Sequence, residues 1–120
     1  MDRIEYVTIH CSATPEGREV SATEIDMWHK MRGWRKIGYH YIIHLDGSVS
    51  QGRTIHEQGA GVKGHNKNNM HICYIGGVDA DLNPKDTRTD AQIDALGQML
   101  VTIRHSFPLA KIQGHRDFPG

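Results

Sequence analysis

The sequence has little cysteine, proline and aromatic content, and neither sign of charge is in excess. Its 120 residues include two cysteines, too few for a disulfide framework, and four prolines. Lysine and arginine together number 14, as do aspartate and glutamate, so the formal net charge is zero. A neutral balance argues against a broad phosphate-binding surface, and we therefore expect no nucleic-acid partner.

Long apolar runs are also missing. No stretch of the sequence is long enough to span a bilayer, so we expect no membrane partner. The first five residues lack the apolar core of a signal peptide. We therefore expect cytoplasmic synthesis without a signal peptide, so that any action outside the cell needs release or export by another route.

What is present suits one ordinary globular domain. Hydrophobic residues make up 38% of the chain and charged residues 23%, and the length supports a single core. We expect a monomer. The one unusual count is nine histidines, and histidine is both a common metal ligand and a frequent acid–base group.

The hydrophobic pattern predicts strand, helix, hairpin, strand, helix and strand, in that order. The first strand is expected over residues 4–9, and a helix from the capping box at Ser21 to near Gly33, with Ile25, Trp28 and either Met27 or Met31 on its apolar face. Residues 39–45 and 48–51 flank Asp46-Gly47 and predict a hairpin with a type I′ turn.

The second half of the sequence continues the alternation. Residues 57–69 are rich in glycine and asparagine and predict a loop, and residues 70–75 predict a strand. A second capping box at Thr89 opens an amphipathic helix that Pro108 ends, with Ile93, Leu96, Leu100, Ile103 and Phe107 at helical spacing. A short strand follows over 109–113. The fold class predicted is α/β, a single domain with a central mixed β-sheet flanked by helices.

Two histidines stand at corresponding places, because His10 and His115 each follow a predicted strand. If those strands lie side by side, both imidazoles reach one edge of the sheet, where a zinc ion could take them as ligands. On the residues alone the alternative stays open that each is an ordinary hydrogen-bonded or solvent-facing histidine.

The aromatic residues and the cysteines divide between functional and structural roles. Tyr39 could donate a hydrogen bond to a developing oxyanion, or simply half-bury its ring. Strand alternation puts Tyr39 on the face of Tyr41 and Ile43, opposite His40 and His44. Trp34, in a loop, is the better candidate for a sugar-binding groove, and Trp28 for the core. For the two cysteines we expect buried free thiols.

Five stretches together carry a resemblance to a known family. They are Ile9-His10-Cys11-Ser12-Ala13-Thr14, Trp28-His29-Lys30 with Gly33-Trp34, Gly38-Tyr39-His40-Tyr41-Ile42-Ile43 with Asp46-Gly47, Ile72-Cys73-Tyr74-Ile75-Gly76-Gly77, and Gly114-His115-Arg116-Asp117. In order and spacing the chain resembles type 2 N-acetylmuramoyl-L-alanine amidases, in the branch of the amidase-type lysozyme of T-odd coliphages. Peptidoglycan recognition proteins share that fold.

The resemblance implies an activity and a site. It implies zinc (Zn2+) bound by two histidines, which match His10 and His115, and by a cysteine or aspartate. It implies a catalytic tyrosine, which matches Tyr39, and hydrolysis of the amide between N-acetylmuramic acid and L-alanine in bacterial peptidoglycan. Substrate contacts are expected from Trp34, and from His65 and Asn66 in the glycine-rich loop. Such an enzyme would lyse or remodel the cell wall, as a phage or prophage endolysin does.

Three departures from the family pattern bear on the site. The family's third ligand and a catalytic lysine lie beyond the second histidine, so residues 1–120 are expected to be an amidase domain that lacks its C-terminal end. Gly61 stands where the family often has a histidine, and His65 where it has tyrosine. His71 replaces a glycine that commonly precedes the Ile-Cys run.

Two alternatives to the enzyme stay open. Without a third ligand the chain could be a non-catalytic module that binds peptidoglycan. The coliphage lysozyme also restrains its phage's RNA polymerase, so a regulatory role toward another protein is a third possibility.

Overall fold

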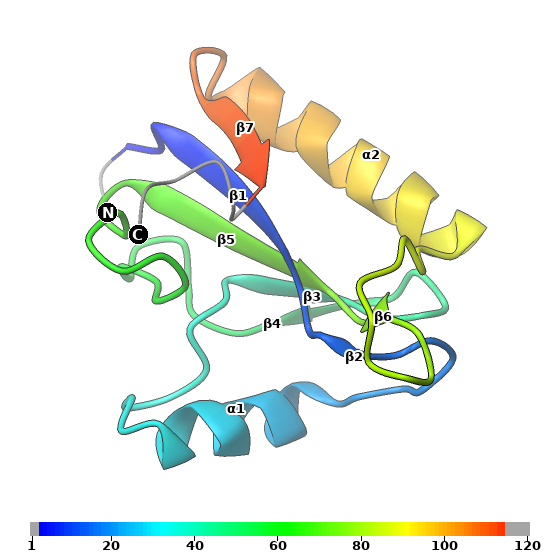
Figure 1. Ribbon diagram of the computed structural model, residues 1–120. Coiled ribbons are helices and arrows are strands. Elements are labelled where there is room, and N and C mark those ends of the chain that lie inside the picture. Colours follow the sequence, from blue (N-terminus) through cyan, green and yellow to red (C-terminus); the bar gives the residue numbers. More distant parts are fainter. Residues whose placement is uncertain (1–2, 115–120) are drawn as a thin grey trace.

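The computed structural model describes residues 3–114 and shows a mixed sheet between two helices. Its strands are β1 (Tyr6–Cys11), β3 (Tyr41–Ile43), β4 (Val49–Gln51), β5 (Asn69–Tyr74) and β7 (Lys111–Gly114), in the order β4-β3-β5-β1-β7. The helices α1 (Ala22–Met31) and α2 (Asp90–Ser106) cover opposite faces of this sheet (Figure 1). Two short strands, β2 (Thr14–Pro15) and β6 (Gly77–Val78), pair separately. The predicted α/β class with a mixed sheet is confirmed.

Both helices begin where the capping boxes predict. At α1 the Ser21 hydroxyl accepts from the Glu24 backbone N–H, and the Glu24 carboxylate accepts from that of Ser21. Thr89 and Gln92 form the same reciprocal pair at α2. These bonds satisfy backbone donors that a helix start leaves without an intrahelical partner.

The carboxyl ends of three parallel strands, β1, β5 and β7, lie at the same end of the sheet. β1 is central, parallel to β5 on one side and to β7 on the other, while β3 runs parallel to β5. Only β4 is antiparallel, through the hairpin with β3. The register sets His10 beside Cys73, and Ile9 beside Gly114. The carboxyl end of the sheet therefore collects the residues that close β1, β5 and β7.

The hairpin is present, but its turn is not the predicted type I′. The His44 N–H donates to the Ser48 carbonyl, and the Gly47 N–H donates to the His44 carbonyl. Gly47 has φ +85°, whereas Asp46 is not among the residues with positive φ. A type I′ turn needs positive φ at both central residues, so this is a three-residue loop with a left-handed glycine.

Two apolar clusters hold the helices to the sheet. The α2 face packs the side chains of Val7, Ile43, Met70, Ile72, Leu96 and Ile103. The α1 face packs Val20, Ile25, Ile37, Ile42 and Ile75, with Trp28 partly buried against them, as predicted.

Two predictions about the buried faces of the helices are wrong, one for a methionine (Met27 or Met31) on α1 and one for Ile93 on α2. Met27 and Met31 are 58% and 84% exposed, because the residues that α1 buries are Ile25 and His29. Ile93 is 47% exposed, because α2 turns Gln92 inward instead. The Gln92 amide N–H group donates to the carbonyls of Ile43 and Ile75, which compensates for its burial. Among residues 3–114 no helix is long and apolar enough to cross a membrane.

Candidate active site

The candidate site is a hollow at the carboxyl end of β1. His10 lies within β1 and not after it, since the strand continues to Cys11. The hollow has a volume of about 570 Å³ and is lined by Ile9, His10, Cys11, Ser12, Ala13, Arg32, Trp34, Tyr39, Gly61, Tyr74 and Gly114. The hollow therefore lies between β1, the loop after α1, the glycine-rich loop and the end of β7.

His10 meets a second imidazole that no sequence motif pointed to. Its Nε2 lies 2.8 Å from Nδ1 of His71, and both residues are buried. Residue 71 lies on the same face of the sheet as His10, because Thr8 and His71 are register partners and side chains alternate along each strand. Alternation along the two parallel strands could have found this pair, once β1 and β5 were known to be neighbours.

Two departures from the family pattern are coupled in space. A Cβ atom at Gly61 would lie 2.7 Å from His71 Nδ1 and 2.9 Å from His10 Nε2. Any side chain at position 61 would therefore collide with the imidazole pair. Gly61 leaves space beside the glycine-rich loop, and the His71 ring from β5 occupies that space.

His40 supports His71 from behind. Its ring stacks on that of His71 with centroids 6.0 Å apart and 6° between planes, and its Nδ1 accepts the His71 backbone N–H at 3.0 Å. The other nitrogen, Nε2, lies 2.8 Å from the Glu57 carbonyl oxygen, which can only accept. The proton of His40 is therefore on Nε2, and burial lowers the pKa of this imidazole.

Tyr39 lies on the α1 side of the sheet, and its predicted place on the face of Tyr41 and Ile43 is wrong. It precedes β3, and His40 forms a bend, so strand alternation does not extend to it. The Tyr39 ring lies 5.2 Å from that of His10 and 5.0 Å from that of His29. Burial, and then the neighbouring Cys73 thiol, raises the pKa of Tyr39, so this phenol is protonated at neutral pH.

His29 and Trp34 form the wall behind Tyr39. His29 Nδ1 accepts the Gly38 backbone N–H at 2.8 Å, and the Trp34 ring meets the imidazole edge-on with centroids 4.5 Å apart. Burial, followed by the charges of Arg32 and Arg53, lowers the pKa of His29 to about 4. His29 is therefore neutral, and by accepting the Gly38 N–H it fixes the backbone just before Tyr39.

The three predicted substrate contacts have different positions. Trp34 lines the hollow, with the Arg32 guanidinium 5.7 Å from its ring centroid. Asn66 and His65 are not among the lining residues. The Asn66 carboxamide oxygen accepts the backbone N–H groups of Gly61 and Val62, so Asn66 shapes the loop that brings Gly61 to the hollow. The His65 carbonyl accepts from the Asn69 amide.

The second predicted metal ligand, His115, lies outside the described residues. The residue before it, Gly114, lines the hollow and is the register partner of Ile9, which precedes His10. Within residues 3–114 no group of three or more histidine, cysteine, aspartate or glutamate side chains could hold a metal. The imidazole of His10 has donor chemistry that suits zinc.

The two cysteines differ in burial. Cys73 is fully buried as expected, and burial raises the pKa of its thiol. Cys11 is only half-buried and lines the hollow, so its predicted burial is wrong. A Cβ at Gly77 would lie 2.4 Å from Cys11 Sγ, which shows how closely β6 passes the thiol.

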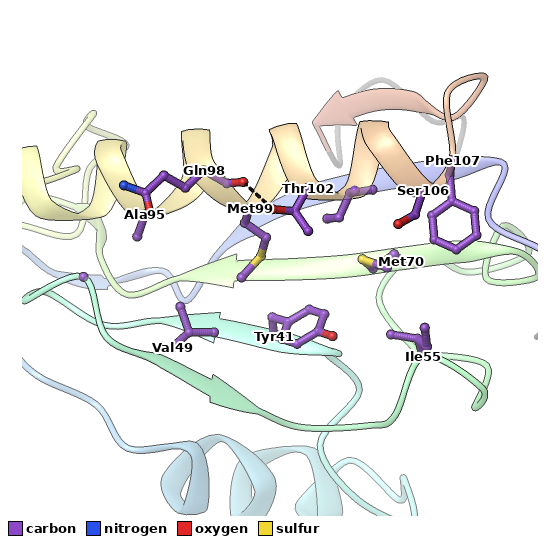
Figure 2. A pocket seen from close by; sticks show the side chains of 12 residues that line it. Tyr41, Val49, Ile55, Met70, Ala95, Gln98, Met99, Thr102, Ser106 and Phe107 are labelled. Atoms are coloured by element: carbon purple, nitrogen blue, oxygen red, sulfur yellow. Dashed lines mark hydrogen bonds between the residues drawn. The ribbon is translucent and has the colours of Figure 1, made fainter.

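A second hollow, of about 530 Å³, opens between α2 and the hairpin. Figure 2 shows Met99, Met70 and Tyr41 pointing into it from α2, β5 and β3. Its walls are mainly apolar and include no histidine, cysteine or carboxylate. It therefore offers an apolar packing surface, whereas the candidate metal-binding and catalytic side chains line the hollow at His10.

Comparisons with known proteins found sequence relatives and solved structures of similar fold. The sequence profile described as N-acetylmuramoyl-L-alanine amidase matches residues 1–120. An endolysin of Enterobacteria phage K11 is 42% identical over 109 residues, which cover 91% of this chain and 72% of that protein. The N-acetylmuramoyl-L-alanine amidase LysC from Clostridium intestinale URNW superposes with a TM-score of 0.84 at 23% identity, covering 98% of this chain and 73% of the other. A bumblebee peptidoglycan recognition protein, PGRP-SA, gives 0.83 at 26% identity, covering 100% and 74%.

Proposed function

This chain belongs to the N-acetylmuramoyl-L-alanine amidase family, and from that premise we propose that it is a zinc hydrolase of bacterial peptidoglycan. The bond cut would be the amide between the lactyl group of N-acetylmuramic acid and L-alanine. The observation that carries the proposal is that His10 and Tyr39 share one hollow, with ring centroids 5.2 Å apart, beside the end of β7.

His10 and His115 would hold the zinc ion. When bound, zinc polarises a carbonyl and lowers the pKa of a water molecule beside it. His115 would be the second ligand, and residues 3–114 hold no group of three side chains that could complete the site by themselves. The His10 side chain is 5% exposed, and it lines the hollow.

Tyr39 would stabilise the oxyanion of the tetrahedral transition state. Its phenol stays protonated, because burial raises its pKa, so the O–H can donate to developing negative charge. The rings of His10 and His29 contact it from two sides. The donor is therefore held in place before substrate binds, which is what makes such a hydrogen bond effective.

Trp34 would provide an aromatic wall for a sugar ring at the rim of the hollow. We infer that residues 1–120 belong to one amidase domain and that the protein acts as a monomer. The phage relative is an endolysin, and we propose that this chain also acts on the cell wall, reached by release or by another export route. His65 and Asn66 would act indirectly, by shaping the loop around Gly61.

Mass spectrometry of purified peptidoglycan incubated with the protein tests the activity. We expect stem peptides that begin with a free L-alanine amino group, and we expect a zinc chelator to stop their release. Absence of cleavage, with the protein still sedimenting with the cell wall, would overturn the enzyme in favour of a binding module.

Two substitutions test the residues, each with a matched control. Tyr39→Phe should keep zinc and lower the rate by about 10²–10³-fold, the usual loss for an oxyanion donor. Tyr41→Phe removes a hydroxyl two residues away on the opposite face and should leave the rate unchanged. His10→Ala should abolish zinc binding, while His105→Ala, on the exposed side of α2, should retain it.

A further inference from the structure

We propose that His71 is a positioning residue for the metal site: it accepts the Nε2–H of His10 and thereby leaves Nδ1 of His10 as the nitrogen that binds zinc. The inference rests on the proposed function in one respect, that His10 is a ligand. The hydrogen bond itself is a property of the protein without metal.

The distance between the two nitrogens identifies their relation. His10 Nε2 and His71 Nδ1 are 2.8 Å apart, the length of a hydrogen bond. Two nitrogens bound to the same tetrahedral zinc at about 2.0–2.1 Å would lie about 3.3 Å from each other. The separation is therefore that of a donor and an acceptor, and we assign His71 as a hydrogen-bond partner of Nε2 and not as a second ligand.

The direction of the hydrogen bond follows if His10 is a metal ligand. A neutral imidazole has one N–H and one lone pair. If His71 donated to His10 Nε2, the His10 proton would be on Nδ1, and neither nitrogen of His10 could take a metal. If His10 donates from Nε2, its lone pair is on Nδ1, which is the arrangement usual for metal-binding histidines.

His71 is held firmly enough to set this geometry. Its side chain is fully buried, and its backbone N–H donates to His40 Nδ1 at 3.0 Å. His40 is itself fixed by its Nε2–H, which donates to the Glu57 carbonyl. The Glu57 carboxylate accepts the Thr54 backbone N–H at 3.0 Å and so anchors that loop. The chain of contacts runs from the loop through His40 and His71 to His10.

Two glycines make room for the imidazole. A Cβ at Gly59 would lie 2.5 Å from His71 Cδ2, and one at Gly61 would lie 2.7 Å from His71 Nδ1. Both distances are shorter than real Cβ contacts allow. The glycine-rich loop therefore packs its backbone directly on the ring and limits the orientations that His71 can adopt.

Nitrogen-detected NMR of histidine-labelled, metal-free protein is the first test. We expect His10 as the Nε2–H tautomer, coupled through the hydrogen bond to His71 Nδ1. A His10 proton on Nδ1 would overturn the proposal. This measurement needs no zinc, so its result is separate from any failure of the proposed function, which would show as a wild-type protein that binds no zinc.

Zinc affinity, measured by competition with a chromophoric chelator, is the second test. His71→Leu removes the acceptor and should weaken zinc binding by about 10–100-fold, the usual effect of losing such a partner. His71→Asn places an amide oxygen where Nδ1 stands and should restore affinity to within a few-fold. Unchanged affinity in His71→Leu would overturn the proposal. So would equal losses in both variants with fewer nitrogen ligands in the cobalt(II) spectrum, because His71 would then be a ligand.

Gly61→Ala tests the same contact without touching a histidine. Its Cβ would push on His71 Nδ1, so zinc affinity should fall and the His10–His71 coupling should disappear. Gly97→Ala, where a Cβ meets nothing within 4 Å, is the matched control and should change neither. An intact coupling in Gly61→Ala would contradict the packing on which the proposal rests.

Discussion

The two faces of the sheet use the same strands for different purposes. On β5, Met70 and Ile72 point toward α2 into an apolar cluster, while His71 points toward the histidines on the other face. The α2 face is held by hydrophobic burial, which is not directional. The histidine face buries polar rings, each of which requires a placed partner. The apolar face should therefore determine stability, and the histidine face should determine chemistry and pH response.

The largest stability effect is expected from the apolar face. Ile72→Ala should lower the free energy of unfolding by about 2–5 kcal/mol, because it removes a fully buried side chain and leaves a cavity. Urea denaturation measures the loss, with Val101→Ala, 73% exposed, as the control. The His10–His71 coupling should survive in the folded variant. Its disappearance would show that the two faces are not independent.

Acid should destabilise the protein through the histidine face. The His29 pKa of about 4 lies below its ordinary value of 6.5, so the unfolded state binds more protons between these values. Stability is then complete above about pH 6.5 and falls as the pH drops toward 4, by up to about 3 kcal/mol for this histidine. Burial lowers the pKa of His40 as well, which adds a loss of the same sign.

His29→Asn sharpens this pH test. The asparagine oxygen can accept the Gly38 N–H in place of Nδ1, but it does not titrate. The slope of unfolding free energy against pH, from urea curves at pH 4–7, should be shallower in the variant. An identical slope would assign the acid sensitivity to other groups.

The fold could be predicted largely from the sequence because its signals are local. Capping boxes at Ser21 and Thr89 set both helix starts, and alternation set the strands. The hairpin was predicted but its turn was not, because Asp46-Gly47 suits both a two-residue turn and a three-residue loop. Ile93 and the α1 methionines failed because helical periodicity alone does not decide which of two adjacent residues faces the sheet.

The site could be predicted only in part, because it depends on contacts between distant strands. His10, Tyr39 and Trp34 were named from motifs, and they line one hollow. Their catalytic roles remain predictions. The imidazole pair was not foreseen, because residues 10 and 71 meet only once β1 and β5 pair in a particular register. Tyr39 was placed on the wrong face, because the bend at His40 is invisible in a pattern of alternation.

Loss of a cap should have a smaller effect and can compare the two helices. Thr89→Ala and Ser21→Ala each remove the hydroxyl of a capping box, at a typical cost of about 1 kcal/mol. The Thr89 hydroxyl also donates to the Leu45 carbonyl of the hairpin, so Thr89→Ala should cost more than Ser21→Ala. Urea denaturation of both variants measures the difference. A larger loss of unfolding free energy in Ser21→Ala than in Thr89→Ala would contradict the stabilising role of the Thr89–Leu45 hydrogen bond.

The smallest effect is expected where α1 faces solvent. Met31 is 84% exposed, so Met31→Lys should change the free energy of unfolding by less than about 0.5 kcal/mol, as exposed substitutions usually do. Ile25→Ala, at a buried position of the same helix, is the contrast and should cost several times more. A clear loss in Met31→Lys would mean that the methionine packs against something in the folded protein. Helical spacing would then have been right to place a methionine on the apolar face of α1.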